Sequence, residues 1–140
     1  MKRIIFPWGV ILLIISMALV SYAKMEKIAI SEGNLGDLKG KWIGSRTVGT
    51  GDTRNTDLEI SNDSLPLQCK FTFYDITLYN KPARTETRDW KGRINDQGNL
   101  FVKGGNVDLE LSLYGDGGKK KLEGNYSWAG RKGTMSFKKK

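Results

Sequence analysis

The side chains available for acid–base chemistry in this 140-residue sequence are carboxylates, because it contains no histidine and one cysteine. Asp108 and Glu110 are two positions apart, which in a β-strand places them on one face about 6.6–6.8 Å apart. That separation suits a paired acid and base, and Glu123 could join them from a later strand. Leucines alternate with these carboxylates, however, which indicates a solvent-exposed face. We therefore expect no catalytic residues and favour a binding protein over an enzyme.

Other reactive or metal-binding motifs are also missing. Without histidine there is no Ser-His-Asp or Cys-His catalysis and no zinc signature. Residues 52–57 have the oxygen spacing of a calcium loop, but they lack its glycine and closing glutamate and include Arg54, so we interpret them as a turn. Cys69 alternates with Phe71 and Phe73, which predicts a buried apolar side chain. We expect neither a metal nor a cofactor.

Aromatic side chains form the second group of candidate functional residues. Strand alternation predicts that one set points into a common interior: Trp42, Phe71, Phe73, Trp90, Leu109, Leu111, Tyr126, Trp128, Met135 and Phe137. The candidate ligand-binding residues within this set are Trp90, Tyr126, Trp128, Phe71 and Phe73. Gly92 and Gly124 either leave space for a ligand or make room for the rings to pack, and dense protein interiors favour packing.

The elements that must position these side chains are β-strands, and the last third of the chain predicts them most clearly. Every second residue of 107–114 is apolar, which is the pattern of a strand with one exposed face. Glycines at 115–118 suit a tight turn, and the alternation resumes over 122–128. A second turn at 129–133 leads to a last strand at 134–137. This segment therefore predicts two successive β-hairpins.

The remainder of the chain continues this pattern. Further strands are predicted at residues 38–44, 56–61, 67–78, 90–94 and 100–102. Within 67–78 the apolar positions change parity, which predicts a bulge or turn near Tyr74 and Asp75. Charged residues 80–89 are predicted to form an exposed connection. The fold class is therefore all-β, with a single antiparallel up-and-down β-barrel of about eight strands.

The N-terminal residues differ from the rest. Lys2 and Arg3 precede an apolar run at 10–20, and Ser21-Tyr22-Ala23 has small residues at both positions that a signal peptidase inspects. We predict a signal helix at 1–23 that is cleaved near Ala23, a leader at 24–37 and the barrel at 38–140. The protein is then exported, either periplasmic or secreted. The alternative is an uncleaved anchor, which would be its only attachment to a membrane.

The charge is basic, with 23 lysines and arginines against 15 aspartates and glutamates. Cleavage would remove Lys2 and Arg3 and lower the net charge from +8 to +6. A charge of this size is typical of a soluble, solvated surface. Lysines at 119–121 and 138–140 predict a basic patch near one rim. The aromatic rings occupy the buried positions instead of lying among these lysines, so we expect no nucleic-acid partner.

Gly40-Lys41-Trp42 in the first barrel strand resembles the Gly-x-Trp that opens lipocalins and their calycin relatives, avidins included. The resemblance implies a closed barrel whose mouth holds one small, usually apolar ligand, with Trp42 sealing the opposite end. Lipocalins also place a late arginine over that tryptophan, and the arginine available here, Arg131, falls in a predicted turn. The chain is shorter than a typical lipocalin and lacks the usual disulfide. Its overall spacing also resembles small exported bacterial proteins of unassigned function.

Three classes of function remain open. The first is an exported β-barrel binding protein for a small apolar ligand, with a cavity between Trp90, Tyr126 and Trp128. The second is a protein-binding envelope accessory or inhibitor module, with a filled barrel, no ligand and an exposed loop at 80–89. The third is an enzyme that uses carboxylates. We assign Gly40, Trp42, Gly92 and Gly124 structural roles. The sequence does not indicate an oligomeric state.

Overall fold

The computed structural model describes residues 25–49, 51–77 and 81–140, and in these residues the fold is almost entirely β-structure. The elements in chain order are β1 (Glu26–Ile28), the 3-10 helix η1 (Glu32–Asp37), β2 (Gly40–Thr47), β3 (Thr53–Ile60), β4 (Leu67–Ile76), β5 (Arg84–Ile94), β6 (Leu100–Gly104), β7 (Val107–Asp116), β8 (Lys119–Trp128) and β9 (Arg131–Lys139). No helix in the described part is long and apolar enough to cross a membrane.

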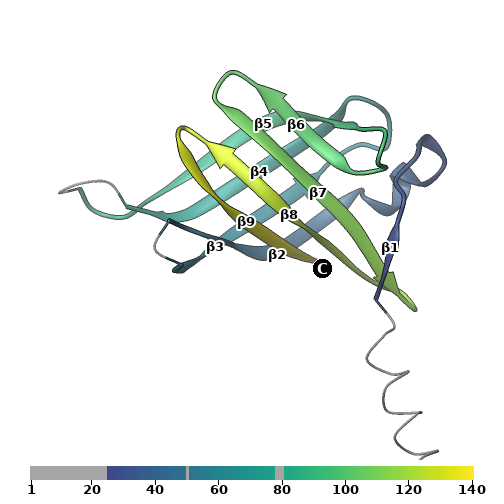
Figure 1. The fold of residues 1–140 in the computed structure, drawn as a ribbon, viewed down its shortest axis with the longest axis horizontal. Coiled ribbons are helices and arrows are strands. Elements are labelled where there is room, and N and C mark those ends of the chain that lie inside the picture. The colour runs from purple at the N-terminus through teal and green to yellow at the C-terminus, as the bar shows by residue number, and fades with distance from the viewer. Residues whose placement is uncertain (1–24, 50, 78–80) are drawn as a thin grey trace, which may run out of the picture.

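Strands β2 to β9 form a closed antiparallel barrel (Figure 1). Each strand pairs with the next in sequence, and β9 pairs back onto β2 through Gly44 and Phe137. The longest ladder joins β7 and β8, from Val107 opposite Trp128 to Asp116 opposite Lys119. The predicted eight-stranded up-and-down barrel is therefore confirmed, and its topology is consistent with a calycin-like fold.

Two details within the predicted strands differ in outcome. The expected irregularity in β4 is confirmed, because Asp75 has a φ of 56° and the pairing with β5 changes register between Phe73 and Ile76. The exposed connection predicted at 80–89 is wrong from residue 84 onward, where β5 begins. There, alternation of charged rather than apolar residues hides the strand, and Glu86 pairs with Arg88 at 3.1 Å within it. Residues 78–80 lie outside the described residues.

Aromatic side chains fill the barrel interior. Every member of the predicted inward set is buried except Trp90, which is partly buried and packs on the core. Phe73 stacks on Trp128 with ring centroids 4.5 Å apart, and Trp90 packs against Phe71 at 5.3 Å. Packing of this density leaves the centre of the barrel to side chains, as is usual in small eight-stranded barrels.

The two inward glycines both serve packing. A Cβ at Gly124 would collide with the carbonyl oxygen of Glu110 on β7, so this glycine admits the backbone of a neighbouring strand. A Cβ at Gly92 would lie 2.8 Å from Leu100 Cδ1 and 3.0 Å from Cys69 Sγ. Neither glycine opens a cavity at its own position.

Trp42 lies at the end of the barrel that the N-terminal segment covers. Its ring is fully buried and its Nε1 donates a hydrogen bond to the carbonyl oxygen of Leu38 at 2.9 Å. The cation over this ring is Lys139, with Nζ 5.6 Å from the centroid, whereas Arg131 lies 5.8 Å from the Trp128 centroid. Arg131 therefore does not have the position over Trp42 that the lipocalin resemblance implies.

The leader is more ordered than the sequence predicts. It contains the 3-10 helix η1 and also β1, whose Ile28 is registered opposite Leu113 of β7. Ile30 and Leu35 are buried, and the Ile30 amide donates to the Gly98 carbonyl oxygen at 2.9 Å. The leader thus closes one end of the barrel. The predicted signal segment, 1–23, lies outside the described residues.

Candidate functional site

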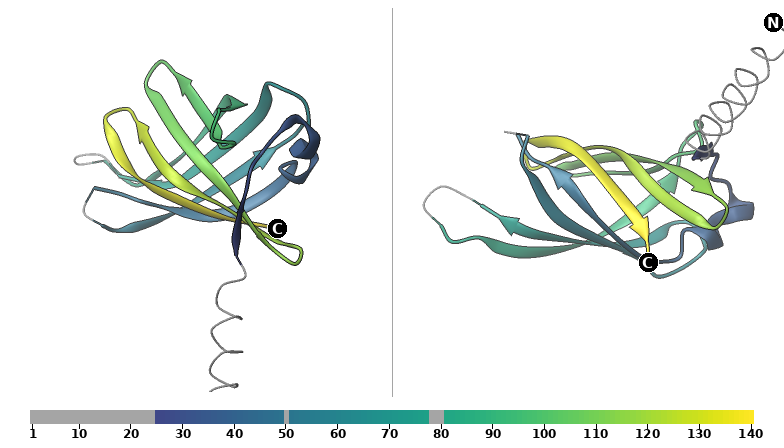
Figure 2. Two further views of the ribbon diagram at one scale, coloured as in Figure 1. Left: turned by 45° about the vertical axis from the view of Figure 1, so that its right-hand side comes forward. Right: turned by 90° about the horizontal axis from the view of Figure 1, so that it is seen from below.

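A pocket of about 910 Å³ is present at the other end of the barrel and is open to solvent. It lies where the β2–β3 and β8–β9 connections approach the last residues of β4. Figure 2 shows that this end is opposite β1 and η1. The volume is within the range of small-molecule sites. The barrel thus has one covered end and one open end with a pocket.

Arg46 forms part of the pocket wall and reaches it from the inner face of β2. Its side chain follows Trp42 and Gly44 at alternate positions of that strand, so the β-pleat turns it inward. Nη1 donates to the Asn55 carbonyl oxygen at 2.8 Å and to Thr56 Oγ1 at 2.9 Å. Nη2 donates to the Tyr74 carbonyl oxygen at 2.7 Å. These bonds fix the guanidinium in a rigid position.

Arg46 is unusual because it is a charged residue of which only 5% is exposed. Burial lowers its pKa from the ordinary value, and nearby Arg54 and Arg131 act in the same direction, while Tyr126 and Asp75 oppose them. Its carbon Cζ lies 5.4 Å from the Phe73 ring centroid, so it covers the top of the aromatic core. Arg46 therefore marks the boundary between the packed interior and the pocket.

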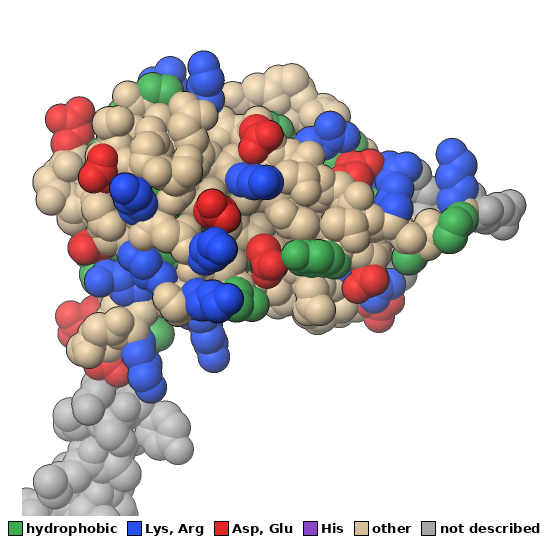
Figure 3. All heavy atoms as spheres, turned by 180° about the vertical axis from the view of Figure 1, so that it is seen from behind, with side chains coloured by type: hydrophobic (Ala, Val, Ile, Leu, Met, Phe, Trp, Pro, Cys, Tyr) green, Lys and Arg blue, Asp and Glu red, His purple; other side chains and the backbone are tan. Residues whose placement is uncertain are grey.

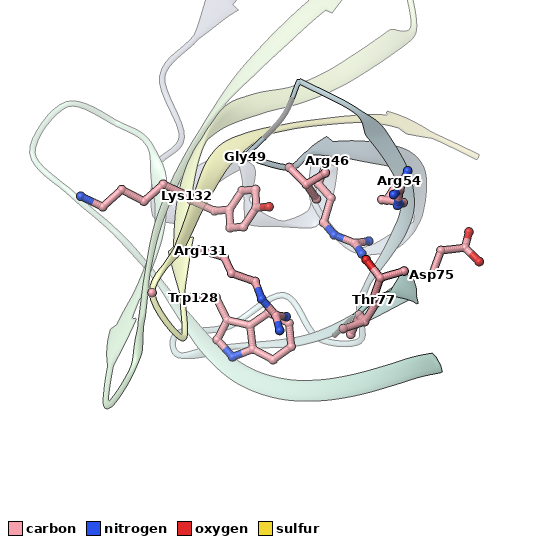
Figure 4. A pocket seen from close by; sticks show the side chains of 12 residues that line it. Arg46, Gly49, Arg54, Asp75, Thr77, Trp128, Arg131 and Lys132 are labelled. Atoms are coloured by element: carbon pink, nitrogen blue, oxygen red, sulfur yellow. The ribbon is translucent and has the colours of Figure 1, made fainter. Parts of the chain in front are cut away.

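Trp128 provides an apolar surface in the pocket. One side of its ring system stacks on Phe73, and two guanidinium groups lie near it: Arg131 at 5.8 Å and Arg88 at 5.6 Å from the ring centroid. Contacts of this kind are worth about 0.5–1 kcal/mol each at exposed sites. In Figure 4, Arg46 and Arg131 point into the pocket near the Trp128 ring.

Tyr126 also lines the pocket, and its hydroxyl already has a partner. It donates a hydrogen bond to the Thr47 carbonyl oxygen at 2.8 Å. The backbone therefore supplies the partner that this buried hydroxyl needs. Burial raises the pKa of Tyr126, while Arg46 and Arg131 oppose that shift. The phenol is therefore neutral at ordinary pH, and its oxygen can still accept a hydrogen bond.

The structure divides the five predicted ligand-binding residues into two groups. Tyr126 and Trp128 line the pocket, whereas Phe71 and Phe73 are fully buried beneath it and Trp90 packs against them. The expected position between Trp90, Tyr126 and Trp128 is therefore occupied by packed rings, and the pocket lies nearer the mouth. Ile76, at the end of β4, adds apolar surface to it.

Sequence reasoning missed the cations of the pocket. Arg46 carried a usable signal, because a charged residue on the inward parity of Trp42 breaks the alternation of β2. Arg54 and Arg131 carried none, because the sequence predicts turns at these positions, whereas they lie at the start of β3 and of β9. An arginine at a buried strand position is expensive without hydrogen-bond partners, so it deserved consideration as a candidate binding residue.

The carboxylates considered for catalysis lie elsewhere. Asp108 and Glu110 are exposed on the outer face of β7, as predicted. Asn99 and Asn95 donate to Glu110 Oε2 at 2.6 and 2.9 Å and hold the pKa of this carboxyl below its ordinary value. A general acid needs a raised pKa, so this environment opposes such a role.

Two further predictions concern reactive or metal-binding groups. The burial of Cys69 is confirmed, with 2% of its surface exposed. Within the described residues, no three His, Cys, Asp or Glu side chains come together in a way that would hold a metal ion. This includes residues 52–57, where the sequence resembles a calcium loop.

No model of a known protein family matches the chain, and no curated protein or solved structure is significantly similar to it. The candidate site therefore rests on the geometry described above.

Proposed function

We propose that this protein is an exported binding protein whose barrel holds one small ligand with an apolar part at its open end. The observation that carries the proposal is the pocket of about 910 Å³ lined by Tyr126, Trp128 and Ile76 directly above a packed aromatic core. Sites for small molecules are concave and mostly apolar, with a few placed polar groups, and this pocket has both features. A rigid floor also limits the conformational cost of binding.

The proposal includes a relationship to calycin barrels of the lipocalin type. The supports are the up-and-down strand order, the closure of β9 onto β2, and Trp42 at the covered end beneath a cation. Export rests on the apolar segment and on Ser21-Tyr22-Ala23. Neither the calycin relationship nor export depends on the pocket, so either of these two proposals can fail without the other.

The filled interior favours a second candidate function, an envelope module that binds another protein. Its surface would be the projecting end of β5, where Arg84, Thr87 and Arg88 are exposed. Native mass spectrometry of protein purified from its own compartment separates the two candidates. A retained small molecule supports the first, and a retained polypeptide supports the second. The protein mass in the same spectrum reports whether residues 1–23 have been removed.

A direct test uses the neutral apolar fluorophore N-phenyl-1-naphthylamine. Thr77 lines the pocket, so Thr77→Trp should fill part of it and weaken binding about tenfold or more, the effect of losing about 1.4 kcal/mol. Thr87→Trp is the matched control, because Thr87 is exposed on β5 and does not line the pocket. Equal affinities for wild type and Thr77→Trp, or no binding by either, would contradict the proposal.

A further inference from the structure

The charges around the pocket are unequal, and this asymmetry extends the proposed function. Arg46, Arg54, Arg131 and Lys132 line the pocket together with a single carboxylate, Asp75. In Figure 4 the Asp75 carboxylate points away from Arg46 and Arg131, and Lys132 extends away from the pocket. The charged side chains directed into the pocket are therefore cationic.

The two central arginines form no ion pair within the described part of the chain, although the charge of Asp75 acts on Arg46 without pairing with it. All three hydrogen bonds of Arg46 go to neutral oxygens, and neither Arg46 nor Arg131 forms an ion pair there. Other arginines do find carboxylates: Arg88 pairs with Glu86 at 3.1 Å, and Arg54 in the same pocket pairs with Asp52 at 3.8 Å. A buried cation without a counter-ion is costly, so an anion entering the pocket would remove an existing electrostatic penalty.

The two guanidinium groups also repel each other. Burial is the main cause of the lowered pKa of Arg46; the charges of Arg54 and, less strongly, Arg131 lower it further, while Tyr126 and Asp75 oppose them. An anionic group between them would convert this repulsion into attraction. Guanidinium groups are suited to the task because their planar fork matches the oxygens of carboxylates and phosphates.

We propose that the ligand is an amphipathic anion: its carboxylate or phosphate head group binds between Arg46 and Arg131, and its apolar part lies against Trp128 and Ile76. The proposal rests on the small-ligand function above and names its ligand class. Tyr126 contributes a neutral phenol oxygen to the same wall. The pocket thus combines a cationic and an apolar surface in the way that such a molecule requires.

The test measures the binding of four probes with the same twelve-carbon chain by calorimetry, below their micelle concentrations. Dodecanoate and dodecyl phosphate are the anions, dodecanol is neutral, and dodecyltrimethylammonium is cationic. We expect at least one anion to bind about tenfold or more tightly than dodecanol, since a charge-assisted hydrogen bond is worth about 1.5–3 kcal/mol. The better anion distinguishes a carboxylate head group from a phosphate.

Arg131→Gln tests the contact itself, because Arg131 is partly exposed and is not held by the hydrogen bonds that fix Arg46. It should abolish most of the preference for the anion, with a much larger loss of affinity for the anion than for dodecanol. Lys132→Gln is the matched control, since it removes the same charge from the adjacent residue, whose side chain extends away from the pocket. This control should retain the preference for the anion.

Three outcomes would overturn the inference. Equal binding of all four probes would retain a ligand pocket but remove its charge selectivity. Equal losses in Arg131→Gln and Lys132→Gln would indicate a diffuse field in place of a head-group contact. Binding of none of the probes or of N-phenyl-1-naphthylamine would remove the proposed function and the inference together.

Discussion

The buried thiol of Cys69 links the stability of this protein to pH. Burial raises its pKa from 9.0 to about 12. Above pH 9 the unfolded chain loses this proton while the folded chain keeps it, so the folded state binds more protons. Stability from this group is therefore complete below pH 9 and is lost as pH rises toward 12. We expect its free energy of unfolding to fall by up to about 1.4 kcal/mol per pH unit in that range.

Urea unfolding at pH 8 and pH 10.5 measures this effect in wild type and in Cys69→Ala. Lysines and tyrosines titrate in both proteins, so the difference between their pH slopes isolates the thiol. The variant should be less stable at pH 8, because a buried side chain is shortened, but it should lose less stability on going to pH 10.5. Identical slopes would mean that water reaches the thiol in the folded protein.

The contrast between Cys69 and Arg46 shows what a sequence reveals about single residues. Cys69 alternates with Phe71 and Phe73, so its burial follows from strand parity alone. Arg46 occupies an equally clear inward position, yet its partners are the Asn55 and Tyr74 carbonyl oxygens, which come from two other strands. Parity predicts where a side chain points, whereas its hydrogen bonds depend on strands that meet only in the folded barrel.

Between neighbouring strands, Gly124 provides a test of how tightly β7 and β8 approach. A Cβ at this position would collide with the Glu110 carbonyl oxygen, and backbone cannot move aside as a flexible side chain can. We expect Gly124→Ala to destabilise the protein by about 3 kcal/mol or more, beyond the usual 1–3 kcal/mol of overpacking. Gly104→Ala is the control, because nothing lies within 4 Å of its Cβ position and it should leave stability within about 1 kcal/mol of wild type.

Thermal unfolding followed by circular dichroism compares these two variants. Similar melting temperatures for Gly124→Ala and Gly104→Ala would show that β7 and β8 can separate at this point without cost. If Gly124→Ala does not fold, Gly124→Ser expressed at lower temperature is expected to fail as well, because it carries the same Cβ.

The order of the strands was predictable because apolar alternation marks the strands and glycines mark the turns between them, most clearly in β7, β8 and β9. Two elements were not. In the outer half of β5, charged residues alternate with threonines, so the sequence has no apolar residue at every second position. Pairing with β4 makes this segment a strand. β1 is three residues long and exists through its register with β7, a contact that local sequence does not encode.

At the scale of the whole molecule, the barrel has a covered end and an open end that contains the pocket. Leu35, Leu38 and Trp42 are buried at the covered end, where Lys139 donates to the Asp37 carbonyl oxygen at 2.6 Å. The pocket is at the opposite end, where Arg46 forms part of its wall. The lysines at the start of β8 and the end of β9, including the registered pair Lys121 and Lys138, belong to the covered end. Acidic side chains are interspersed among the basic ones on the outer face in Figure 3. The cations of the pocket are thus a separate group.

This separation predicts that stability and ligand binding can be altered independently. Leu35→Ala removes a buried side chain of η1 and should lower the free energy of unfolding by about 2–5 kcal/mol. Affinity for dodecanoate should stay within about twofold of wild type at temperatures where the variant is folded, because distant sites without shared partners act additively. Arg131→Gln should show the converse, with weaker dodecanoate binding and nearly unchanged stability.

Urea unfolding and calorimetry on the same preparations measure both properties, and Gly36→Ala is the control in η1, since its Cβ position has nothing within 4 Å. A large loss of dodecanoate affinity in Leu35→Ala would mean that the packed rings between the two ends transmit a change from one to the other. That result would make the aromatic core, from Phe71 to Trp128, a coupling element; independence would instead assign it the role of a rigid partition, which its dense packing favours.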